Sequence, residues 1–227
     1  MTVLRLRLAG SLALLALGTT GCAAGRTGTE QAPGPPAAST EELEAIYRAR
    51  LDSARMRFTA DDVRFMQSMI AHHAQALVMA RLAPTHDASP AVQTLAARII
   101  NAQQDEIATM QRWLRDRGQT VPEIHIEGTT LMVHGSEHGA HMPGMLSAEQ
   151  LRELDLARAQ AFDRKFLTFM IQHHRGAVVM VDALFATDGA GQDEDVFRFA
   201  SDAQVDQRTE IARMELLLEG LAPPASP

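Results

Sequence analysis

A duplicated motif constrains the fold of this chain more than any other feature of its sequence. The pattern Asp-x2-Phe-x3-Met-Ile-x-His-His-x5-Met begins at Asp62 and again at Asp163, an offset of 101 residues. A second shared pattern, Glu-Ile-x2-Met, begins at Glu106 and at Glu210, an offset of 104 residues. Self-similarity of this kind indicates one supersecondary unit that occurs twice. The chain is therefore expected to fold as two related halves.

The spacing within the motif is that of a helix face. At 100° per residue, its Asp, Phe, Met and His positions fall on one side of a helix. A first helix is predicted after the capping box Ser39-x-x-Glu42, and further helices over about 59–82, 89–118, 147–184 and 194–218. Aromatic residues make up only 4% of the chain, which favours helices over a β-sandwich. Two duplicated helical hairpins predict an all-α, pseudo-symmetric four-helix bundle whose like faces meet near the pseudo-axis.

The N-terminal region is typical of an exported protein. Residues 1–21 are predicted to be a signal peptide, because Arg5 and Arg7 precede an apolar run that is too short to span a bilayer permanently. Cys22 follows small residues, as in a bacterial lipobox, so lipidation at Cys22 is expected. Thr19 stands where Leu, Val or Ile is usual, and a cleaved signal with an incidental cysteine is the alternative.

Composition divides the rest of the chain into a linker and a domain. Residues 22–39 are small and Pro-rich, which predicts a flexible, lipid-anchored linker. Residues 40–222 are predicted to be the duplicated helical domain. Within it, residues 119–146 are rich in Gly, His, Met and Thr and predict a long irregular connection. The expected location is the periplasmic face of the cell envelope, with the protein either lipid-anchored to the membrane or secreted.

Net charge and cysteine usage exclude several classes of function. The formal net charge is -7, and it becomes more negative when the signal peptide is removed, which argues against nucleic-acid binding. Cys22 is the only cysteine, so neither a disulfide framework nor a thiolate metal site can form in the domain. Any metal chemistry must rest on His, Met, Asp and Glu. No protein partner can be identified from the sequence.

The duplicated face carries residues that bind transition metals. Met69 and His73 are i,i+4 neighbours and Met66 lies one turn earlier, so their side chains can converge on one ion. Thioether and imidazole ligands together suit copper above all, although another transition metal is possible. In the second copy Leu167 stands in the place of Met66, so the second site is expected to have one thioether fewer.

Packing inside a core is the competing interpretation. A Met stripe on a helix is most often core, and we favour that for Met79, Met110, Met180 and Met214. For the two His-His pairs, ligation is favoured over hydrogen-bonded core histidines and over surface histidines, because the pair recurs on an apolar face.

The connection between the halves contains a second candidate set of ligands. Three His and two Met fall within twelve residues, among glycines that would let the backbone wrap around an ion. A solvated flexible loop is the alternative. His86 and His125 stand alone and are interpreted as ordinary loop residues. The five candidate ligands are His134, His138, His141, Met142 and Met145.

At these residues the chain resembles a known family. The segments FMQSMIAHHAQALVMA and HMPGMLSAEQLRELDLARAQAFDRKFLTFMIQHHRGAVVM are similar to the bacterial domain of unknown function 305 family, over about residues 55–219. The resemblance implies a ferritin-like bundle in exported or membrane-anchored proteins, some of them associated with copper binding and tolerance. Leu167 departs from the Met common in that family. By position, the implied ligands are Met66, Met69, His72, His73, Met79, Met142, Met145, Met170, His173, His174 and Met180.

Three functions are compatible with these patterns. The leading hypothesis is an extracytoplasmic copper-binding lipoprotein that serves buffering, tolerance or transfer. The enzymatic alternative is a ferritin-like di-metal oxidase, to which Glu106 and Glu210 could supply one carboxylate per half; no Glu-x-x-His occurs in the chain, and the residues favour binding over catalysis. The third is a partner-binding helical module without a metal.

Overall fold

The structure, a computed structural model, describes residues 38–55, 57–135 and 142–221. Contacts divide the chain into residues 1–40 and 41–227, and the candidate site lies in the second unit. The predicted signal peptide, Cys22 and most of the predicted linker lie outside the described residues. The elements are α1 Thr40–Arg55, α2 Ala60–Ala80, the 3-10 turn η1 Ala83–Thr85, α3 Pro90–Asp116, β1 Glu123–Glu127, β2 Thr130–His134, α4 Ala148–Leu156, α5 Ala159–Ala186 and α6 Glu194–Glu219.

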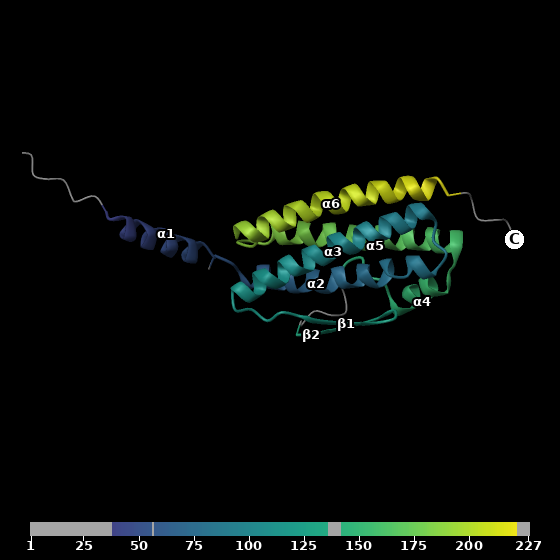
Figure 1. The fold of residues 1–227 in the computed structure, drawn as a ribbon, viewed down its shortest axis with the longest axis horizontal. Coiled ribbons are helices and arrows are strands. Elements are labelled where there is room, and N and C mark those ends of the chain that lie inside the picture. The colour runs from purple at the N-terminus through teal and green to yellow at the C-terminus, as the bar shows by residue number, and fades with distance from the viewer. Residues whose placement is uncertain (1–37, 56, 136–141, 222–227) are drawn as a thin grey trace, which may run out of the picture. The chain divides into compact units, whose positions relative to one another are not determined.

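The long helices form two hairpins. In Figure 1, α2 runs beside α3 and α5 beside α6, and the contacts between α2 and α5 join the two hairpins. The mostly helical class and the two hairpins predicted from the sequence are confirmed. Among the helices of the described ranges, none has both the length and the apolar character needed to cross a membrane.

The helix ends follow the predicted capping signals. Thr59 and Asp62 form a capping box, in which the Asp62 amide donates to Thr59 Oγ1 at 3.1 Å and the Thr59 amide donates to Asp62 Oδ2 at 2.8 Å. Ser89 caps α3, whose first residue is Pro90. Gly118 ends α3 with a φ of +64°, a left-handed conformation that favours glycine.

The prediction of one helix over 147–184 is wrong, because the helix breaks between α4 and α5. His86, which was interpreted as an ordinary loop residue, is buried and lies at this break. Its Nε2 lies 2.9 Å from the carbonyl oxygen of Asp155, and its own carbonyl accepts the amide of Ala159 at 2.9 Å. These contacts satisfy backbone groups that the break leaves without a helical partner.

The prediction that residues 119–146 are irregular is also wrong in part. Strands β1 and β2 pair antiparallel, from Glu123 opposite His134 to Glu127 opposite Thr130. Their burial alternates, so that Ile124 and Ile126 face the helices while the residues between them face solvent. This period of two is visible in the sequence and could have predicted the hairpin.

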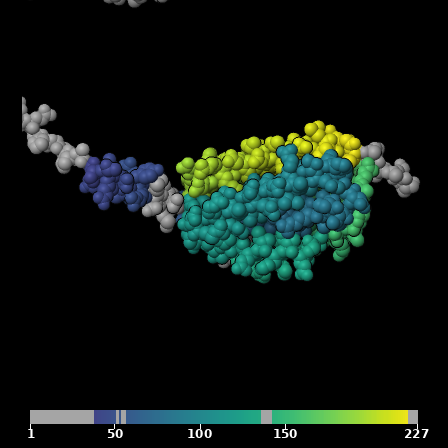
Figure 2. Space-filling view, viewed as in Figure 1, coloured from purple at the N-terminus to yellow at the C-terminus, as the bar shows by residue number. Residues whose placement is uncertain are grey.

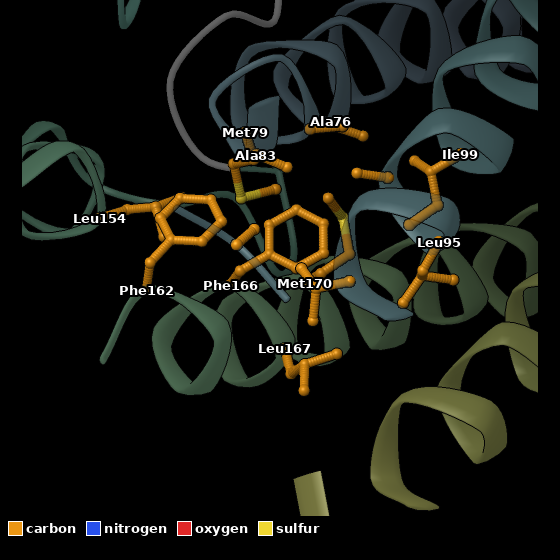
Figure 3. Close-up of a cluster of buried hydrophobic side chains, with 14 of the residues drawn as sticks. Ala76, Met79, Ala83, Leu95, Ile99, Leu154, Phe162, Phe166, Leu167 and Met170 are labelled. Carbon is orange, nitrogen blue, oxygen red and sulfur yellow. The ribbon is translucent and has the colours of Figure 1, made fainter. Parts of the chain in front are cut away.

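Two apolar clusters fill the interior. The cluster drawn in Figure 3 brings side chains of α2, α3, α4 and α5 together, with Phe162 and Phe166 stacked at a ring centroid distance of 5.8 Å. The other cluster lies among α2, α3, α5 and α6 and includes Phe65 and Trp113. Full burial of one such side chain stabilises the fold by roughly 1.5–3 kcal/mol. The histidines of the motif lie between these clusters along α2 and α5.

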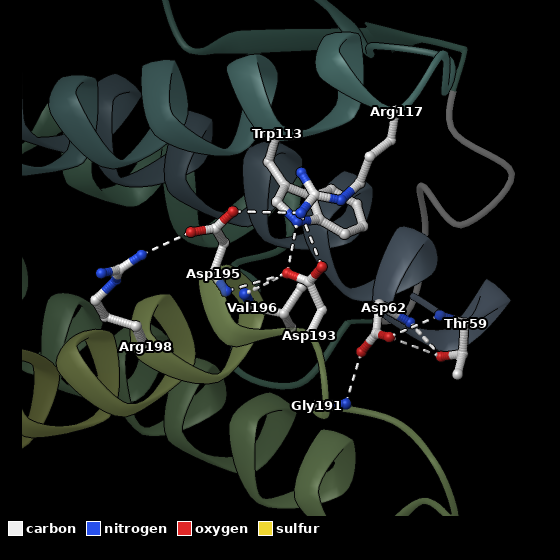
Figure 4. Close-up of polar contacts among 9 residues, drawn as sticks. All are labelled: Thr59, Asp62, Trp113, Arg117, Gly191, Asp193, Asp195, Val196 and Arg198. Carbon is white, nitrogen blue, oxygen red and sulfur yellow. Dashed lines mark hydrogen bonds and ion pairs between the residues drawn. The ribbon is translucent and has the colours of Figure 1, made fainter. Parts of the chain in front are cut away.

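Buried polar contacts connect the two hairpins. Asp62 of α2 accepts the amide of Gly191, ahead of α6, at 2.6 Å (Figure 4). Its counterpart in the second copy, Asp163 of α5, accepts the amide of Ser89, ahead of α3, at 3.1 and 3.3 Å. The Asp of the repeat therefore binds the opposite hairpin in both copies.

A buried ion pair adds a third connection. Arg117, at the end of α3, donates to Asp193 at 2.8 Å, and its guanidinium lies 4.5 Å from the ring centroid of Trp113 (Figure 4). Asp193 also accepts the Trp113 indole N–H at 3.0 Å and caps α6. Because its acceptor sites are filled in this way, the buried carboxylate is paired and hydrogen-bonded.

Candidate metal centre

The four histidines of the motif meet where α2 contacts α5. His72 and His73 come from α2, His173 and His174 from α5, and all four are at most 1% exposed. The rings of His72 and His173 lie 3.8 Å apart between centroids, tilted by 34°. The prediction that the like faces of the two copies meet is confirmed.

The first histidine of each pair binds a backbone carbonyl. His72 Nε2 lies 3.0 Å from the carbonyl oxygen of Pro143, and His173 Nε2 lies 2.9 Å from the carbonyl oxygen of His72. A carbonyl oxygen can only accept, so both Nε2 atoms carry the proton.

The second histidine of each pair binds a carboxylate from the neighbouring helix of its own hairpin. His73 Nε2 lies 2.5 Å from Glu106 Oε2 of α3, and His174 Nε2 lies 2.6 Å from Glu210 Oε2 of α6. The two glutamates are the duplicated residues at offset 104. Each hairpin therefore contains the same pair of a buried histidine and a partly exposed glutamate.

The other ring nitrogen of each of these four histidines has no hydrogen-bond partner in the part of the chain that the structure describes. The Nδ1 atoms of His72, His73, His173 and His174 are buried and unpaired among the described residues. With Nε2 donating its proton, a neutral ring presents a lone pair at Nδ1. Histidines that bind metals characteristically donate their other N–H to a carboxylate or a backbone carbonyl. The hydrogen-bond pattern therefore fits a transition-metal ion.

Burial keeps the central histidines neutral. The pKa of His72 is lowered from 6.5 to about 3, first by burial and then by the neighbouring His73, against the opposing hydrogen bond to Pro143. The pKa of His173 is lowered well below 6.5 by burial and then by His72, His174 and His73. A metal binds the neutral imidazole, so both rings are in the binding form at neutral pH.

Methionines gather in two groups, and each group mixes the two copies of the motif. Met180 of α5 packs against the cluster of the first-copy methionines, whereas Met79 of α2 packs in the cluster of Met170. The second group has Leu167 in place of a thioether. The first group consists of Met66, Met69, Met110 and Met180, and the second of Met79, Met170 and Met214.

Residues 143–146, ahead of α4, pack against α2 and α5 beside the histidines. Gly144 approaches Gly176 of α5 so closely that a Cβ on Gly144 would lie 2.7 Å from the Gly176 Cα. Gln75 binds both the amide and the carbonyl of Leu146, at 2.7 and 3.0 Å. These contacts place the Pro143 carbonyl against His72.

Three of the five candidate ligands of the connection lie within the described residues. Met142 and Met145 line a cavity of about 400 Å³ together with residues of α2, α4 and β2. His134 lies at the end of β2. His138 and His141 lie outside the described residues.

A cavity of about 490 Å³ lies beside Met66 of the first methionine group. Its charged lining consists of five acidic residues, Glu106, Asp116, Asp195, Asp202 and Asp206, and three arginines, Arg112, Arg117 and Arg198. The pKa of Asp206 is raised by burial and then by the nearby carboxylates of Glu106, Glu210 and Asp202. The lining therefore has more acidic than basic side chains, and an excess of negative charge attracts cations.

A di-metal oxidase of the ferritin-like type needs several carboxylates and histidines around a pair of ions. Over the ranges that the structure describes, no three side chains of the His, Cys, Asp and Glu types are close enough to hold an ion. Glu106 and Glu210 instead bind histidines. An ion at this centre would need thioether ligands beside imidazole, which favours copper.

The sequence did not predict the hydrogen-bond acceptors of the histidines, which include two glutamates and the Pro143 carbonyl. Glu106 and Glu210 were considered as metal ligands, whereas they orient His73 and His174. Their duplication at a constant offset was the available signal. The acceptor role of Pro143 has no signal in the sequence, because a backbone carbonyl is present at every residue.

Comparison with known proteins gives a family match and several structural matches. The model of the domain of unknown function DUF305 matches residues 62–218. The crystal structure of a DUF305 fragment from Deinococcus radiodurans has 32% identity and a TM-score of 0.60, and the match covers 72% of this chain and 99% of that one. No curated protein matches the chain.

CopM is a second structural relative, solved with bound metal. Its Cu(I)-bound form has 26% identity and a TM-score of 0.53, with 71% of this chain and 98% of that chain covered. Its Cu(II)-bound form has 26% identity and a TM-score of 0.55, with coverages of 71% and 97%.

Proposed function

This chain belongs to the DUF305 family, and from that premise we propose that it binds copper in the cell envelope and buffers the ion or hands it on. One observation carries the proposal: four buried histidines each have Nε2 bound to a fixed acceptor and Nδ1 without a partner. A core histidine that served packing alone would be expected to satisfy both nitrogens, because an unpaired buried polar atom costs about 1–3 kcal/mol.

The proposed ligands are the imidazoles of both copies with the thioethers beside them. His73 would act with Met69 and Met66, and His174 with Met170. His72 and His173 lie between the two sets, where they could serve either ion. Met79 and Met180 complete the proposed set from the opposite copy. When bound, copper would be held as cargo by soft and borderline ligands without thiolates, which oxidise easily outside the cytoplasm.

The remaining parts of the proposal are supported by sequence and by relatives. CopM has been solved in Cu(I)-, Cu(II)- and Ag-bound forms, and that supports a related ion here. A ferritin-like bundle agrees with the two packed hairpins. A signal peptide over 1–21 and a lipid anchor at Cys22 would place the domain at the periplasmic face. The connection ligands Met142, Met145, His134, His138 and His141 would form an auxiliary site.

The test is an anaerobic Cu(I) titration of the full chain against a competing chelator. In the test variant, His72, His73, His173 and His174 are all changed to Gln, which keeps an N–H donor and removes the Nδ1 lone pair. The control is His86→Gln, because His86 is also buried but both of its ring nitrogens have hydrogen-bond partners.

We expect tight uptake by the wild-type chain and by H86Q, and a large loss in the fourfold variant. X-ray absorption of the bound ion should show both nitrogen and sulfur ligands. Thermal unfolding of each variant checks that it is folded. Absence of uptake by the wild-type chain would reject the function, whereas equal uptake by all three would reject the histidine centre.

A further inference from the structure

The solvent face of the β1–β2 hairpin concentrates metal-binding side chains at one end. The hairpin lies at the surface, along the lower edge of the view in Figure 2. Its inner residues pack on the helices, so the outer residues are fixed in register. The outer face consists of Glu123, His125, Glu127, Thr130, Met132 and His134.

Cross-strand pairing brings four of these residues together. Glu123 lies opposite His134, and His125 lies opposite Met132. The two imidazole rings, diagonal neighbours on the same face, have centroids 5.9 Å apart and are tilted by 61°. Directly opposed side chains on one face of an antiparallel pair have Cβ atoms about 4.5–5.5 Å apart. Two imidazoles, a thioether and a carboxylate thus share one exposed patch.

We propose that this patch binds a divalent transition-metal ion, with Cu(II) preferred, through the imidazoles of His125 and His134. Met132, opposite His125, would add a thioether, and water would complete the coordination. Glu123, opposite His134, would attract the cation by its charge and would not be a third ligand. Imidazole suits Cu(II) and Zn(II), and among divalent ions of the first transition row Cu(II) forms the most stable complexes with such ligands.

The arrangement differs from an ordinary solvated strand face in two ways. The two histidines, Glu123 and Met132 lie together toward one end of the hairpin. At the other end, Glu127 lies opposite Thr130 and has no histidine or methionine opposite it. Met132 is also 41% exposed, although methionine usually fills apolar interiors. His125, interpreted from sequence as an isolated loop residue, becomes a ligand only through strand pairing.

This site is separate from the buried centre. It lies on a hairpin between the two copies of the motif, and its residues have no counterparts in the repeat. Its exposed imidazoles would take up an ion from solution without any movement of α2 or α5. The proposal therefore does not depend on copper binding by the buried histidines.

Cu(II) titration of the full chain in air, followed by electron paramagnetic resonance, tests the proposal. The test variant is His125→Ala with His134→Ala. The matched control is Glu127→Ala with Thr130→Ala, two side chains that oppose each other on the same outer face at the other end of the hairpin. A second pair compares Glu123→Gln with Glu127→Gln, two carboxylates of the same strand face. The fourfold histidine-to-glutamine variant of the buried centre completes the set.

We expect the wild-type chain to show a Cu(II) signal split by two nitrogen ligands, and H125A/H134A to lack it. The signal should persist in E127A/T130A and in the variant of the buried centre, and E123Q should weaken binding more than E127Q. Circular dichroism checks folding, which substitution of exposed side chains should leave unchanged. Persistence of the signal in H125A/H134A, or its loss in E127A/T130A or in the buried-centre variant alone, would overturn the proposal. The anaerobic Cu(I) titration reports separately on the proposed function.

Discussion

The two histidines of each His-His pair have different roles, because adjacent residues on a helix point about 100° apart. His72 and His173 face each other and bind carbonyl oxygens, whereas His73 and His174 turn toward carboxylates of α3 and α6. The pair is therefore a unit in which one ring reaches the partner helix across the pseudo-axis and the other is held within its own hairpin.

Acid is expected to destabilise the metal-free protein through the central histidines. The pKa of His72 is about 3 when folded and 6.5 when unfolded, and that of His173 is lowered in the same direction. Below pH 6.5 the two imidazoles are protonated in the unfolded chain but remain neutral in the folded chain. The free energy of unfolding therefore decreases as the pH falls from 6.5 toward 3. The His72 ring should cost roughly 2 kcal/mol between pH 7 and pH 5, and the His173 ring should add to the loss in the same direction.

Urea denaturation at pH 7 and pH 5 measures this dependence. His72→Gln should make the loss smaller, while His125→Gln, at an exposed position, should leave it unchanged. An equal loss of stability in the wild-type chain and in H72Q would show that His72 is protonated in the folded state as well.

The glutamate partners should tune the affinity of the proposed copper centre. Glu106→Gln and Glu210→Gln keep a side chain of similar size but remove the negative charge that orients His73 and His174. Such changes to groups behind a metal ligand typically cost 10- to 100-fold in affinity. Chelator competition should show this weakening in both variants, and Asp105→Asn, an exposed neighbour on α3, should bind as the wild-type chain does.

At the scale of elements, the contact between the Met-Pro-Gly-Met segment and α5 completes the centre. Gly144 has a φ of +76°, and a Cβ there would lie 2.6 Å from the carbonyl oxygen of Gln172. A Cβ on Gly176 would overlap the Pro143 carbonyl. Both positions require glycine, since backbone meets backbone there. The sequence suggests that Met142 and Met145 of this segment bind a metal. The interaction with the centre that the structure describes is the hydrogen bond from His72 to the Pro143 carbonyl.

Gly176→Ala should displace this segment and lower stability by about 1–3 kcal/mol, the usual cost of overpacking. The shift should be visible as a lower thermal midpoint and as new chemical shifts for Pro143 and His72. Gly220→Ala is the control, because a Cβ there meets only ordinary contacts at 3.5 Å. Equal stability of G176A and G220A would contradict the close approach.

At the scale of the whole molecule, the two hairpins are connected by reciprocal contacts of the repeated Asp. Asp62 and Asp163 each bind an amide that precedes the second helix of the other hairpin. Together with the Arg117–Asp193 pair, these contacts couple the stability of one hairpin to that of the other. Such coupling is expected of a buried centre whose residues come from both hairpins.

Asp163→Ala should lower the stability of both halves together, by about 1–3 kcal/mol, because the Ser89 amide loses its acceptor. Asp62→Ala should cost more, since Asp62 also caps α2. Urea unfolding can be followed by the fluorescence of Trp113 in α3 and by the NMR signals of the α5 amides. Both signals should show one transition at a lower urea concentration than in the wild-type chain. Separate transitions would show that the hairpins fold independently. The control, Asp105→Ala, should unfold as the wild-type chain does.

The sequence by itself determined the helical class, the two related halves, most helix ends and the face that carries His and Met. These features depend on spacing and capping over a few residues, and the repeat supplies each of them twice. Only the tertiary structure decided which atoms meet. The acceptor of His72 lies 71 residues away and that of His73 lies 33 away, Met79 packs with the methionines of the opposite copy, and His125 gains its partners through strand pairing. Such contacts depend on how the hairpins pack and where strands pair, because helical periodicity specifies a direction around an axis but not the group that lies there.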